Sequence, residues 1–191
     1  MSAILYPAIH KAAQIKGKTL TFRDVMVDDA DFILSLRTDQ QKSRYLSTTS
    51  SDSNKQRLWL DSYSVADDQA YFIIEFNGEP IGTVRLYDAR QNSFCWGSWI
   101  LKAGSPKHAA IESALMVYAY AVEHLSFQSA HFDVRKGNES VWLFHERFGA
   151  RRISETDLDY LYTLDFKAIK ASCSRCSKFL PYGIIVLGKP E

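Results

Sequence analysis

The sequence predicts a single α+β domain, with a mixed β-sheet of about six to seven mostly antiparallel strands and about four helices on its two faces. The 191 residues are the length of one domain. Segments with the alternation of strands and segments with the period of helices follow in the order β-α-α-β-β-β-α-β-α-β-β. A long apolar helix stands between two strands in the second half, which predicts a right-handed parallel crossover in this sheet.

The first half of the chain contains the clearest local signals. Asn77-Gly78 lies between two β-rich runs, and this dipeptide favours a type I′ turn because both residues tolerate positive φ. Asp28 stands at the N-cap position of one helix, and Ser53 and Gln56 form a capping box that opens another. The predicted elements of this half are a strand at 19–23, helices at 28–38 and 53–66, and strands at 70–76, 80–88 and 93–101.

Helical periodicity dominates the second half. Apolar residues over 109–125 form so broad a face that this helix must be largely buried. A second helix over 138–148 ends at Gly149, which suits the C′ position. Short strands are predicted at 131–135 and 159–166, and residues 167–191 are expected to hold a terminal strand and an irregular tail without an assigned function.

Composition and charge exclude several classes of function. A net charge of +1 removes the basic field that nucleic-acid binding relies on, so no nucleic-acid partner is expected. No apolar run reaches the roughly 20 residues that span a bilayer, so no membrane partner is expected. The first residues lack the basic region of a secretory signal, which leaves residues 1–18 as a leader or extension.

The cysteines indicate neither a disulfide framework nor a metal site. Their count of three is odd, which is atypical of secreted scaffolds, and the chain is expected to be cytoplasmic. Cys173 and Cys176 supply only two of the four ligands that structural zinc needs, and no second pair follows. We therefore expect no metal.

The loop between strand 93–101 and the long helix is the first candidate site. Unpaired N–H groups and the macrodipole at a helix N-terminus favour an anion, especially phosphate. Lys102 and Lys107 flank this loop and would neutralise charge. An ordinary strand-to-helix turn with two solvated lysines explains the same residues.

Two polar residues of helix 138–148 are further candidates. His145 lies near the apolar edge of the helix, and its reference pKa of about 6.5 suits proton transfer near neutrality. A His at such a position more often only hydrogen-bonds a neighbour. Asn138 stands directly before the helix, where an N-cap is the simpler role.

A basic loop between the first two helices is the candidate for substrate binding. Lys42, Arg44 and Arg57 gather there, and Arg44 with Tyr45 would hold a phosphate or a carboxylate unless these charges are merely solvated. Arg44, Tyr45 and Arg85 are the candidate substrate-binding residues.

Three stretches of the chain resemble the GNAT superfamily of acyl-CoA-dependent N-acetyltransferases, in particular the branch of ribosomal-protein and amino-sugar acetyltransferases. The stretches are 98–101, 109–115, and 134–138 followed by 144–150, of which the last is the most specific. The resemblance covers residues 19–166 and implies a three-layer fold with a splayed parallel pair of strands. Residues 167–191 are then a C-terminal extension.

The resemblance also implies acetyl-CoA as co-substrate. Strand 98–101 would pair with pantetheine, the following loop would receive the pyrophosphate, and His145 takes the position of the family Tyr that protonates the leaving thiolate. The loop departs from the family pattern, because Lys107, His108 and Ala109 align with its Gly-x-Gly portion. The cofactor-binding residues implied in this way are Trp99, Ile100, Leu101, Lys102, Gly104, Lys107, His108, Ala109, Ala110 and Asn138.

The function implied by the resemblance is direct acetyl transfer from acetyl-CoA to a primary amine. A nucleotide-linked amino sugar of surface-polysaccharide biosynthesis is the favoured acceptor, held beneath the basic loop. Glu75, Asp133 and a water relay all stay open as the base. The alternatives are a protein N-terminal amine as acceptor, a non-catalytic acyl-CoA-binding protein, and an interaction module built on the cysteine-containing tail; a homodimer is left open. The assignment as an acetyltransferase depends on two neighbouring strands separating beside Trp99–Leu101.

Overall fold

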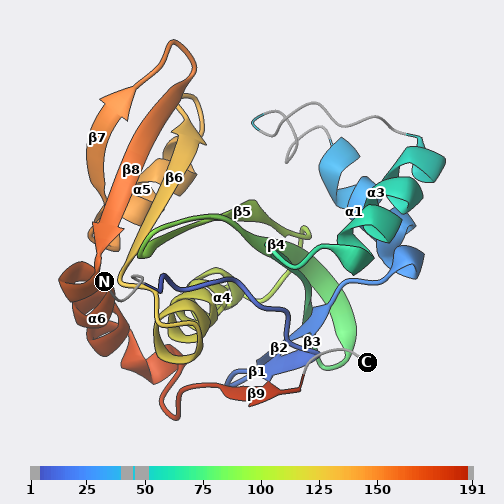
Figure 1. Ribbon diagram of the computed structural model, residues 1–191, viewed down its shortest axis with the longest axis horizontal. Helices are drawn as coiled ribbons and strands as arrows, with labels where there is room; N and C mark the ends of the chain where they lie inside the picture. Colours follow the sequence, from blue (N-terminus) through green and yellow to red (C-terminus); the bar gives the residue numbers. More distant parts are fainter. Residues whose placement is uncertain (1–4, 40–44, 46–51, 189–191) are drawn as a thin grey trace.

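The computed structural model describes residues 5–39, 45 and 52–188. In these residues one nine-stranded sheet has the strand order β7-β8-β6-β5-β4-β3-β2-β1-β9 (Figure 1). Every neighbouring pair is antiparallel except β5 and β6, which are parallel. The strands are β1 (Gln14–Lys16), β2 (Leu20–Asp24), β3 (Ala70–Phe76), β4 (Glu79–Arg90), β5 (Ser93–Leu101), β6 (Ser129–Arg135), β7 (Arg151–Glu155), β8 (Asp159–Asp165) and β9 (Ile185–Leu187).

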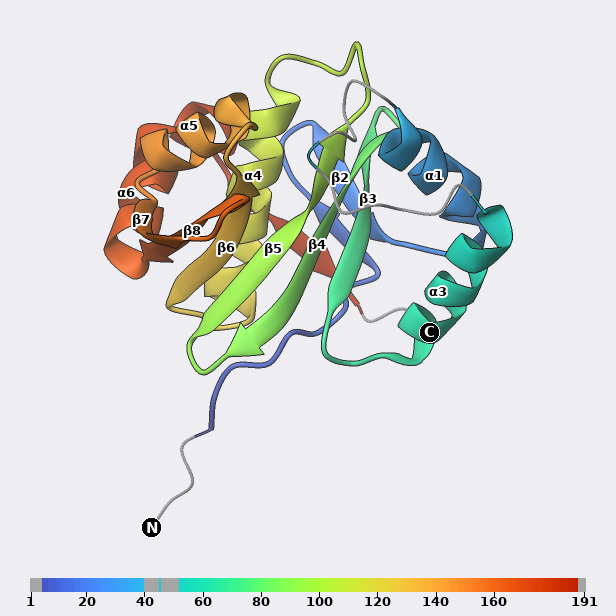
Figure 2. The same ribbon diagram turned by 90° about the horizontal axis from the view of Figure 1, so that it is seen from above.

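Helices cover both faces of this sheet, as predicted. The helices α1 (Ala30–Thr38) and α3 (Ser53–Val65) pack on one face, and α4 (Ala109–Ala119) is buried on the other (Figure 1). The helices α5 (Glu139–Arg147) and α6 (Phe166–Arg175) share the core of α4. Figure 2 shows α1 and α3 at one end of the sheet and β7, β8 and α5 at the other. No helix in the described ranges is long and apolar enough to cross a bilayer.

Local turn chemistry was predicted well, but the helix starts were not. Asn77 and Gly78 have φ of 54° and 80°, as a type I′ turn requires, and Gly149 ends α5 with φ of 100°. The two predicted N-caps, Asp28 and Ser53, were wrong. The N-cap of α3 is Asp52, whose carboxylate accepts a hydrogen bond from the Asn54 N–H at 2.9 Å. The first helix is preceded by a 3₁₀ turn, Val27–Asp29, and the predicted helix 109–125 ends in a π-helical turn, Tyr120–His124.

The sheet has more strands than expected because β1 and β7 were not predicted, and both flanks of the predicted domain contribute a strand to it. Ile9, Ala12 and Ile15 are buried, and β1 and β9 pair at one edge. The tail after 166 begins with a helix that was not predicted, and the expected terminal strand follows near its end as β9. The N-cap of this helix is Asp165, which accepts a hydrogen bond from the Ala168 N–H at 2.9 Å, and Ile169 faces the core.

The parallel strands β5 and β6 separate where the sequence predicted that they would. They pair from Ser93 and Ser129 to Cys95 and His131, and the pairing ends there. On the other side of β5, the register with β4 shifts between Thr83 and Arg85, so that β5 carries an extra residue. Ser98 in this bulge has φ of 47°, and the Thr83 hydroxyl donates a hydrogen bond to the Ser98 carbonyl at 2.7 Å. The bulge bends β5 away from β6.

Candidate active site

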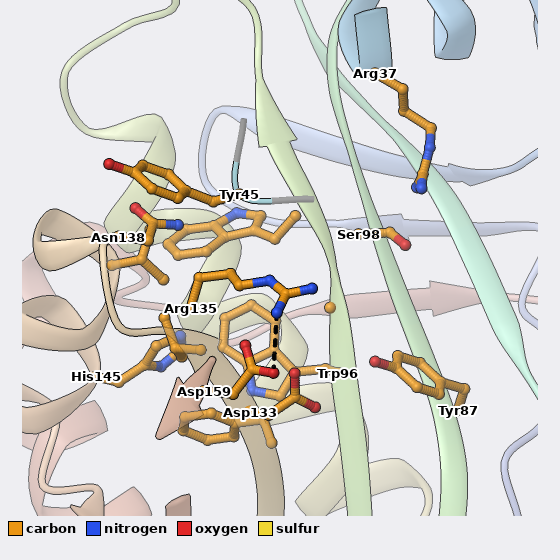
Figure 3. Close-up of a pocket in the computed structure, with 15 residues that line it drawn as sticks. Arg37, Tyr45, Tyr87, Trp96, Ser98, Asp133, Arg135, Asn138, His145 and Asp159 are labelled. Atoms are coloured by element: carbon orange, nitrogen blue, oxygen red, sulfur yellow. Dashed lines mark hydrogen bonds and ion pairs between the residues drawn. The ribbon is translucent and has the colours of Figure 1, made fainter. Parts of the chain in front are cut away.

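A cavity of about 290 Å³ occupies the opening between β5 and β6 (Figure 3). Residues 96–99 of β5 line one wall, and residues 132–135 of β6 with α5 line the other. Arg37, from the last turn of α1, and Tyr45 complete the rim. The fold therefore leaves an accessible slot at the point where neighbouring parallel strands have stopped pairing.

Aromatic side chains form the helix-facing side of the cavity. Trp99 contacts Trp96 and Phe144, with ring centroids 5.2 and 5.1 Å apart. The indole N–H of Trp99 donates a hydrogen bond to the Ser113 hydroxyl of α4 at 3.1 Å. This side of the cavity is apolar, which suits an alkyl chain or a thioester better than a charged group.

His145 lies deep in this aromatic wall. It is 5% exposed, and its ring centroid lies 4.2 Å from that of Phe132 and 5.3 Å from that of Trp96. Its Nδ1 is buried without a hydrogen-bond partner in the described part of the chain. Burial lowers the pKa of His145 to about 3, because the apolar surroundings disfavour the charged ring. The imidazole is therefore neutral at physiological pH.

The opposite side of the cavity, toward α1, is polar. Asp133 and Tyr87 line it, and Arg135 of β6 is held by Asp159 at 3.3 Å (Figure 3). Burial raises the pKa of the Tyr87 hydroxyl, so this group stays protonated at neutral pH. One half of the cavity is therefore apolar, and the other half carries the positive charge of Arg135 and the negative charges of Asp133 and Asp159.

The predicted site residues fall into two groups in the structure. The side chains of Trp99, Asn138, His145 and Tyr45 meet at the cavity. Tyr45 lies over Gly137, where an added Cβ would be 2.9 Å from the Tyr45 ring. Lys42 and Arg44 lie outside the described residues, so their role stays a prediction. The predicted residues that do not line this cavity are Ile100, Leu101, Lys102, Gly104, Lys107, His108, Ala109, Ala110 and Arg85.

The loop at the start of α4 carries backbone N–H groups that are not paired within the described residues. Ala109 begins the helix and donates its N–H to Pro106, whereas the N–H groups of Lys107, His108 and Ala110 find no hydrogen-bond partner among the described residues. The His108 side chain is turned away toward β2, where its Nε2 lies 2.9 Å from the Thr19 hydroxyl. The His108 ring is therefore engaged away from this loop, and the binding of a ligand by the loop stays a prediction.

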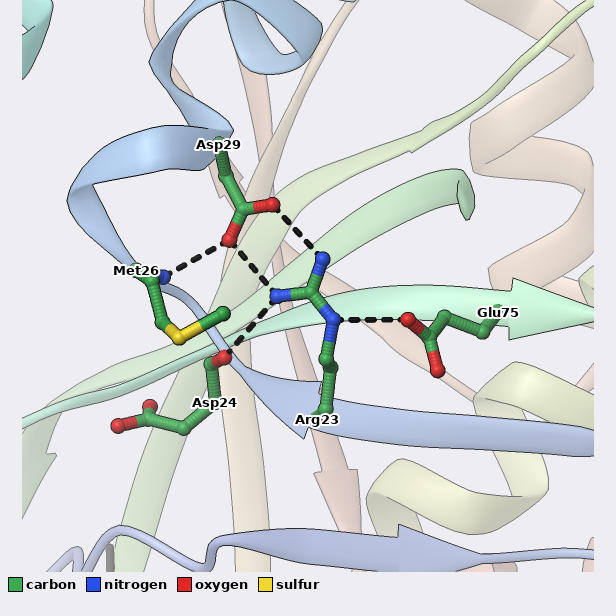
Figure 4. Close-up of polar contacts among 5 residues, drawn as sticks. All are labelled: Arg23, Asp24, Met26, Asp29 and Glu75. Carbon is green, nitrogen blue, oxygen red and sulfur yellow. Dashed lines mark hydrogen bonds and ion pairs between the residues drawn. The ribbon is translucent and has the colours of Figure 1, made fainter. Parts of the chain in front are cut away.

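The two acidic residues considered as the catalytic base, Glu75 and Asp133, lie in different parts of the structure. Glu75 accepts a hydrogen bond from Arg23 Nε at 2.7 Å, and Asp29 binds the other side of the same guanidinium (Figure 4). This cluster ties β2 and β3 to the start of α1, and Glu75 does not line the cavity. Asp133 does line it. No group of three or more His, Cys, Asp or Glu side chains within the described ranges could hold a metal ion.

Sequence reasoning missed part of the polar wall. Arg37, Tyr87 and Asp159 were not considered, although each lines the cavity. The signal for Tyr87 was available, because alternation along β4 places it on the same face as Arg85. Arg37 and Asp159 belong to elements far apart in the chain, and only the tertiary fold brings them to the cavity.

Comparison with known proteins identifies the fold and the family. The model of the acetyltransferase (GNAT) domain matches residues 19–151, which is most of the chain. The structure of apo FdhC, a nucleotide-linked sugar GNAT, is 40% identical with a TM-score of 0.79, and the match covers 87% of this chain and 98% of FdhC. Comparison with curated protein sequences gives no significant match.

More distant structures share the fold alone. A putative acetyltransferase from T. thermophilus is 16% identical with a TM-score of 0.71, over 93% of this chain and 98% of that one. A chimera of spermidine N-acetyltransferase SpeG from Vibrio cholerae and hSSAT is 15% identical with a TM-score of 0.69, over 80% of this chain and 99% of that one. The domain match and the 40% identity to FdhC show that the chain belongs to the GNAT family, whose domains use acetyl-CoA as co-substrate, and that it is an N-acetyltransferase.

Proposed function

We propose that this enzyme acetylates the amino group of a nucleotide-linked amino sugar. The observation that carries the proposal is the 40% identity to a nucleotide-linked sugar GNAT, which extends over nearly the whole of both chains. The cavity supports it, because a polar wall with Arg37, Arg135 and Asp133 suits a hydroxylated, charged acceptor. The surface-polysaccharide context and a cytoplasmic location are parts of the same proposal.

The splayed strands provide the reaction geometry in this proposal. The thioester occupies the opening between β5 and β6, with its acyl carbonyl against the unpaired edge of β5 near Ile100. The acceptor amine attacks this carbonyl, a C–N bond forms, and the C–S bond to CoA breaks. A backbone N–H of β5 stabilises the oxyanion, a contribution of about 3–4 kcal/mol in well-studied oxyanion holes. The pyrophosphate lies at the loop containing Lys102, Gly104 and Lys107.

His145 is the proposed donor to the departing sulfur. Since its pKa is about 3 in the free protein, it acts from the neutral ring by donating an N–H hydrogen bond to the sulfur. The negative charge that develops on the sulfur favours a proton on the imidazole, because an adjacent anion raises the pKa of His. The apolar surroundings make this interaction stronger than it would be in water.

Asp133 is the proposed base. It lies on the polar wall of the cavity, whereas Glu75 is engaged by Arg23 in a separate cluster. The Asp133 carboxylate takes the amine proton directly or through a water molecule, which produces the nucleophilic free amine. This arrangement places the acid on the apolar side of the cavity and the base on its polar side.

Acetyl transfer to three acceptors tests the proposal. Purified enzyme is incubated with acetyl-CoA and with a thymidine or uridine diphosphate amino sugar, the same sugar without its nucleotide, or a peptide with a free N-terminus. Thiol release measures the rate. We expect kcat/KM for a nucleotide-linked sugar to exceed the others by at least 100-fold. A preference for the peptide, or no turnover of any amine, would overturn the proposal.

A further inference from the structure

Arg85 is a partly buried cation beside the active-site cavity. It lies on β4 between two aromatic rings, with its guanidinium carbon 5.1 Å from the ring centroid of Trp59 and 4.7 Å from that of Tyr87. Its Nε is buried without a hydrogen-bond partner, and within the described ranges it forms no ion pair. The Gln69 amide oxygen, just before β3, is likewise buried and unpartnered among the described groups.

Other arginines of the chain show how unusual this arrangement is. Arg152 also lies over an aromatic ring, 3.4 Å from the centroid of Tyr160, but Glu146 binds it at 3.0 Å. Arg23 is bound by two carboxylates at 2.7 Å. Desolvating a guanidinium is costly unless an anion or a hydrogen-bond acceptor compensates it. At Arg85 the burial is present, and the compensating acceptor is not supplied by the described protein groups.

Arg85 is connected to the cavity through Tyr87. Gly97, a residue of the cavity wall, is the register partner of Arg85 across β4 and β5. An added Cβ at Gly97 would lie 3.1 Å from the Tyr87 hydroxyl, so the missing side chain leaves room for the Tyr87 ring. The hydroxyl end of Tyr87 therefore lies at the cavity, and the face of its ring packs against the Arg85 guanidinium.

A second guanidinium lies near Arg85, and the exposed Asp68 acts on Arg85 electrostatically without forming an ion pair with it. Arg37 and Arg85 both lie close enough to Tyr71 to act electrostatically on its hydroxyl, and Arg37 lines the cavity. Arg37 thus lines the cavity itself, and Arg85 lies behind the cavity residue Tyr87. A planar guanidinium binds an oxyanion through two parallel hydrogen bonds, and aromatic rings on its faces leave its N–H edge available for this.

We infer that Arg85, held between Trp59 and Tyr87, is the subsite for an oxyanion of the acceptor, a phosphate or a carboxylate. This inference rests on the proposed function in one respect: a nucleotide-linked sugar supplies the oxyanion as its diphosphate. The subsite lies on the face of the sheet that carries α1 and α3, so the acceptor enters from that side and its sugar amine extends past Tyr87 toward β5. Arg85 determines specificity and does not take part in bond breaking.

Calorimetric titration tests the subsite independently of turnover. The probes are thymidine diphosphate, uridine diphosphate and glucuronate, each added to enzyme saturated with CoA so that the cofactor site is filled. The proteins are the wild type, Arg85→Gln, Arg85→Lys and the control Arg90→Gln, which removes an exposed arginine from the far end of the same strand. Thermal unfolding of each protein verifies that it is folded.

The expected result is diphosphate binding that weakens at least tenfold in Arg85→Gln, weakens less in Arg85→Lys and stays within twofold in Arg90→Gln. If Arg85→Gln does not fold, the affinity of Arg85→Lys for the diphosphates decides instead. This variant keeps the positive charge and loses the planar fork, so weaker binding than in the wild type supports the subsite and equal binding overturns it. Binding of glucuronate alone, lost in Arg85→Gln, supports the oxyanion subsite and identifies a carboxylate as its source. Equal affinity in wild type and Arg85→Gln, or no binding of any probe to wild type, overturns the inference. Failure to acetylate a nucleotide-linked sugar would instead refute the proposed function.

Discussion

Replacing His145 by Phe should remove a pH-dependent part of the stability of this protein. The His145 side chain is 5% exposed, and burial lowers its pKa to about 3. In the unfolded chain a histidine has a pKa of about 6.5. As the pH falls, the unfolded state therefore binds the proton first. The contribution is fully present above pH 6.5 and is lost progressively as the pH falls toward 3.

The magnitude follows from the two pKa values. When the pH falls from 7.5 to 5.0, the protonation of this one group in the unfolded state should lower the free energy of unfolding by about 2 kcal/mol, at roughly 1.36 kcal/mol for each pKa unit. His145→Phe abolishes the titration, so the variant should lose about 2 kcal/mol less than the wild type over the same interval. Each protein is compared with itself at two pH values, and the packing cost of the larger ring therefore cancels.

Urea titrations at the two pH values, followed by tryptophan fluorescence, measure this difference. An equal pH dependence in the wild type and in His145→Phe would refute the assignment of His145 as a buried neutral ring. The same variant should reduce kcat for acetyl transfer by roughly 10- to 100-fold, which is the effect of losing one hydrogen bond to a charged group. A kcat within twofold of the wild type would remove His145 from the proposed mechanism.

Three further variants test the site and the bulge that opens it. Asp133→Asn should lower kcat by about 100-fold or more with little change in KM, since it removes the proposed base and leaves the binding wall; steady-state kinetics that show only a KM effect would contradict this. Gly82→Ala should destabilise the fold by about 2 kcal/mol or more in urea, because an added Cβ would lie 2.3 Å from the Ile100 carbonyl oxygen. Thr83→Val should cost about 1 kcal/mol and lower kcat/KM, because it removes the hydrogen bond to the Ser98 carbonyl; an unchanged rate would show that the bulge holds without it.

Local chemistry explains which elements could be predicted. Asn77-Gly78 specifies its turn because few other residues tolerate two consecutive positive φ angles, and the broad apolar face of 109–125 requires burial in any fold. The short strands β1 and β7 could not be found in this way, and β9 was expected only as a terminal strand somewhere within residues 167–191. Strands of three to five residues carry little periodicity, and their stability comes from pairing with neighbours far along the chain.

The N-caps of the helices likewise could not be assigned from the sequence alone. Ser53 and Asp52 are both good N-cap residues, so the sequence alone does not choose between them. Asp29 directly follows the predicted N-cap Asp28, a position where an acid favours the helix dipole, and in the structure it is a partner of Arg23. A side chain with two suitable roles takes the one that its tertiary neighbours favour.

The element order in the central part of the fold and the motifs of the family resemblance came from the sequence alone, because each depends on residues close together in the chain. The separation of strands beside Trp99–Leu101 was implied by that resemblance, and the structure confirms it. The tertiary structure decided the chemistry of the site. The reference pKa of His145 suggested an acid that titrates near neutrality, and its packing against Trp96, Phe132 and Phe144 lowers this pKa to about 3. Burial and charge pairing are sums over neighbours from many elements, and a sequence does not state which elements will meet.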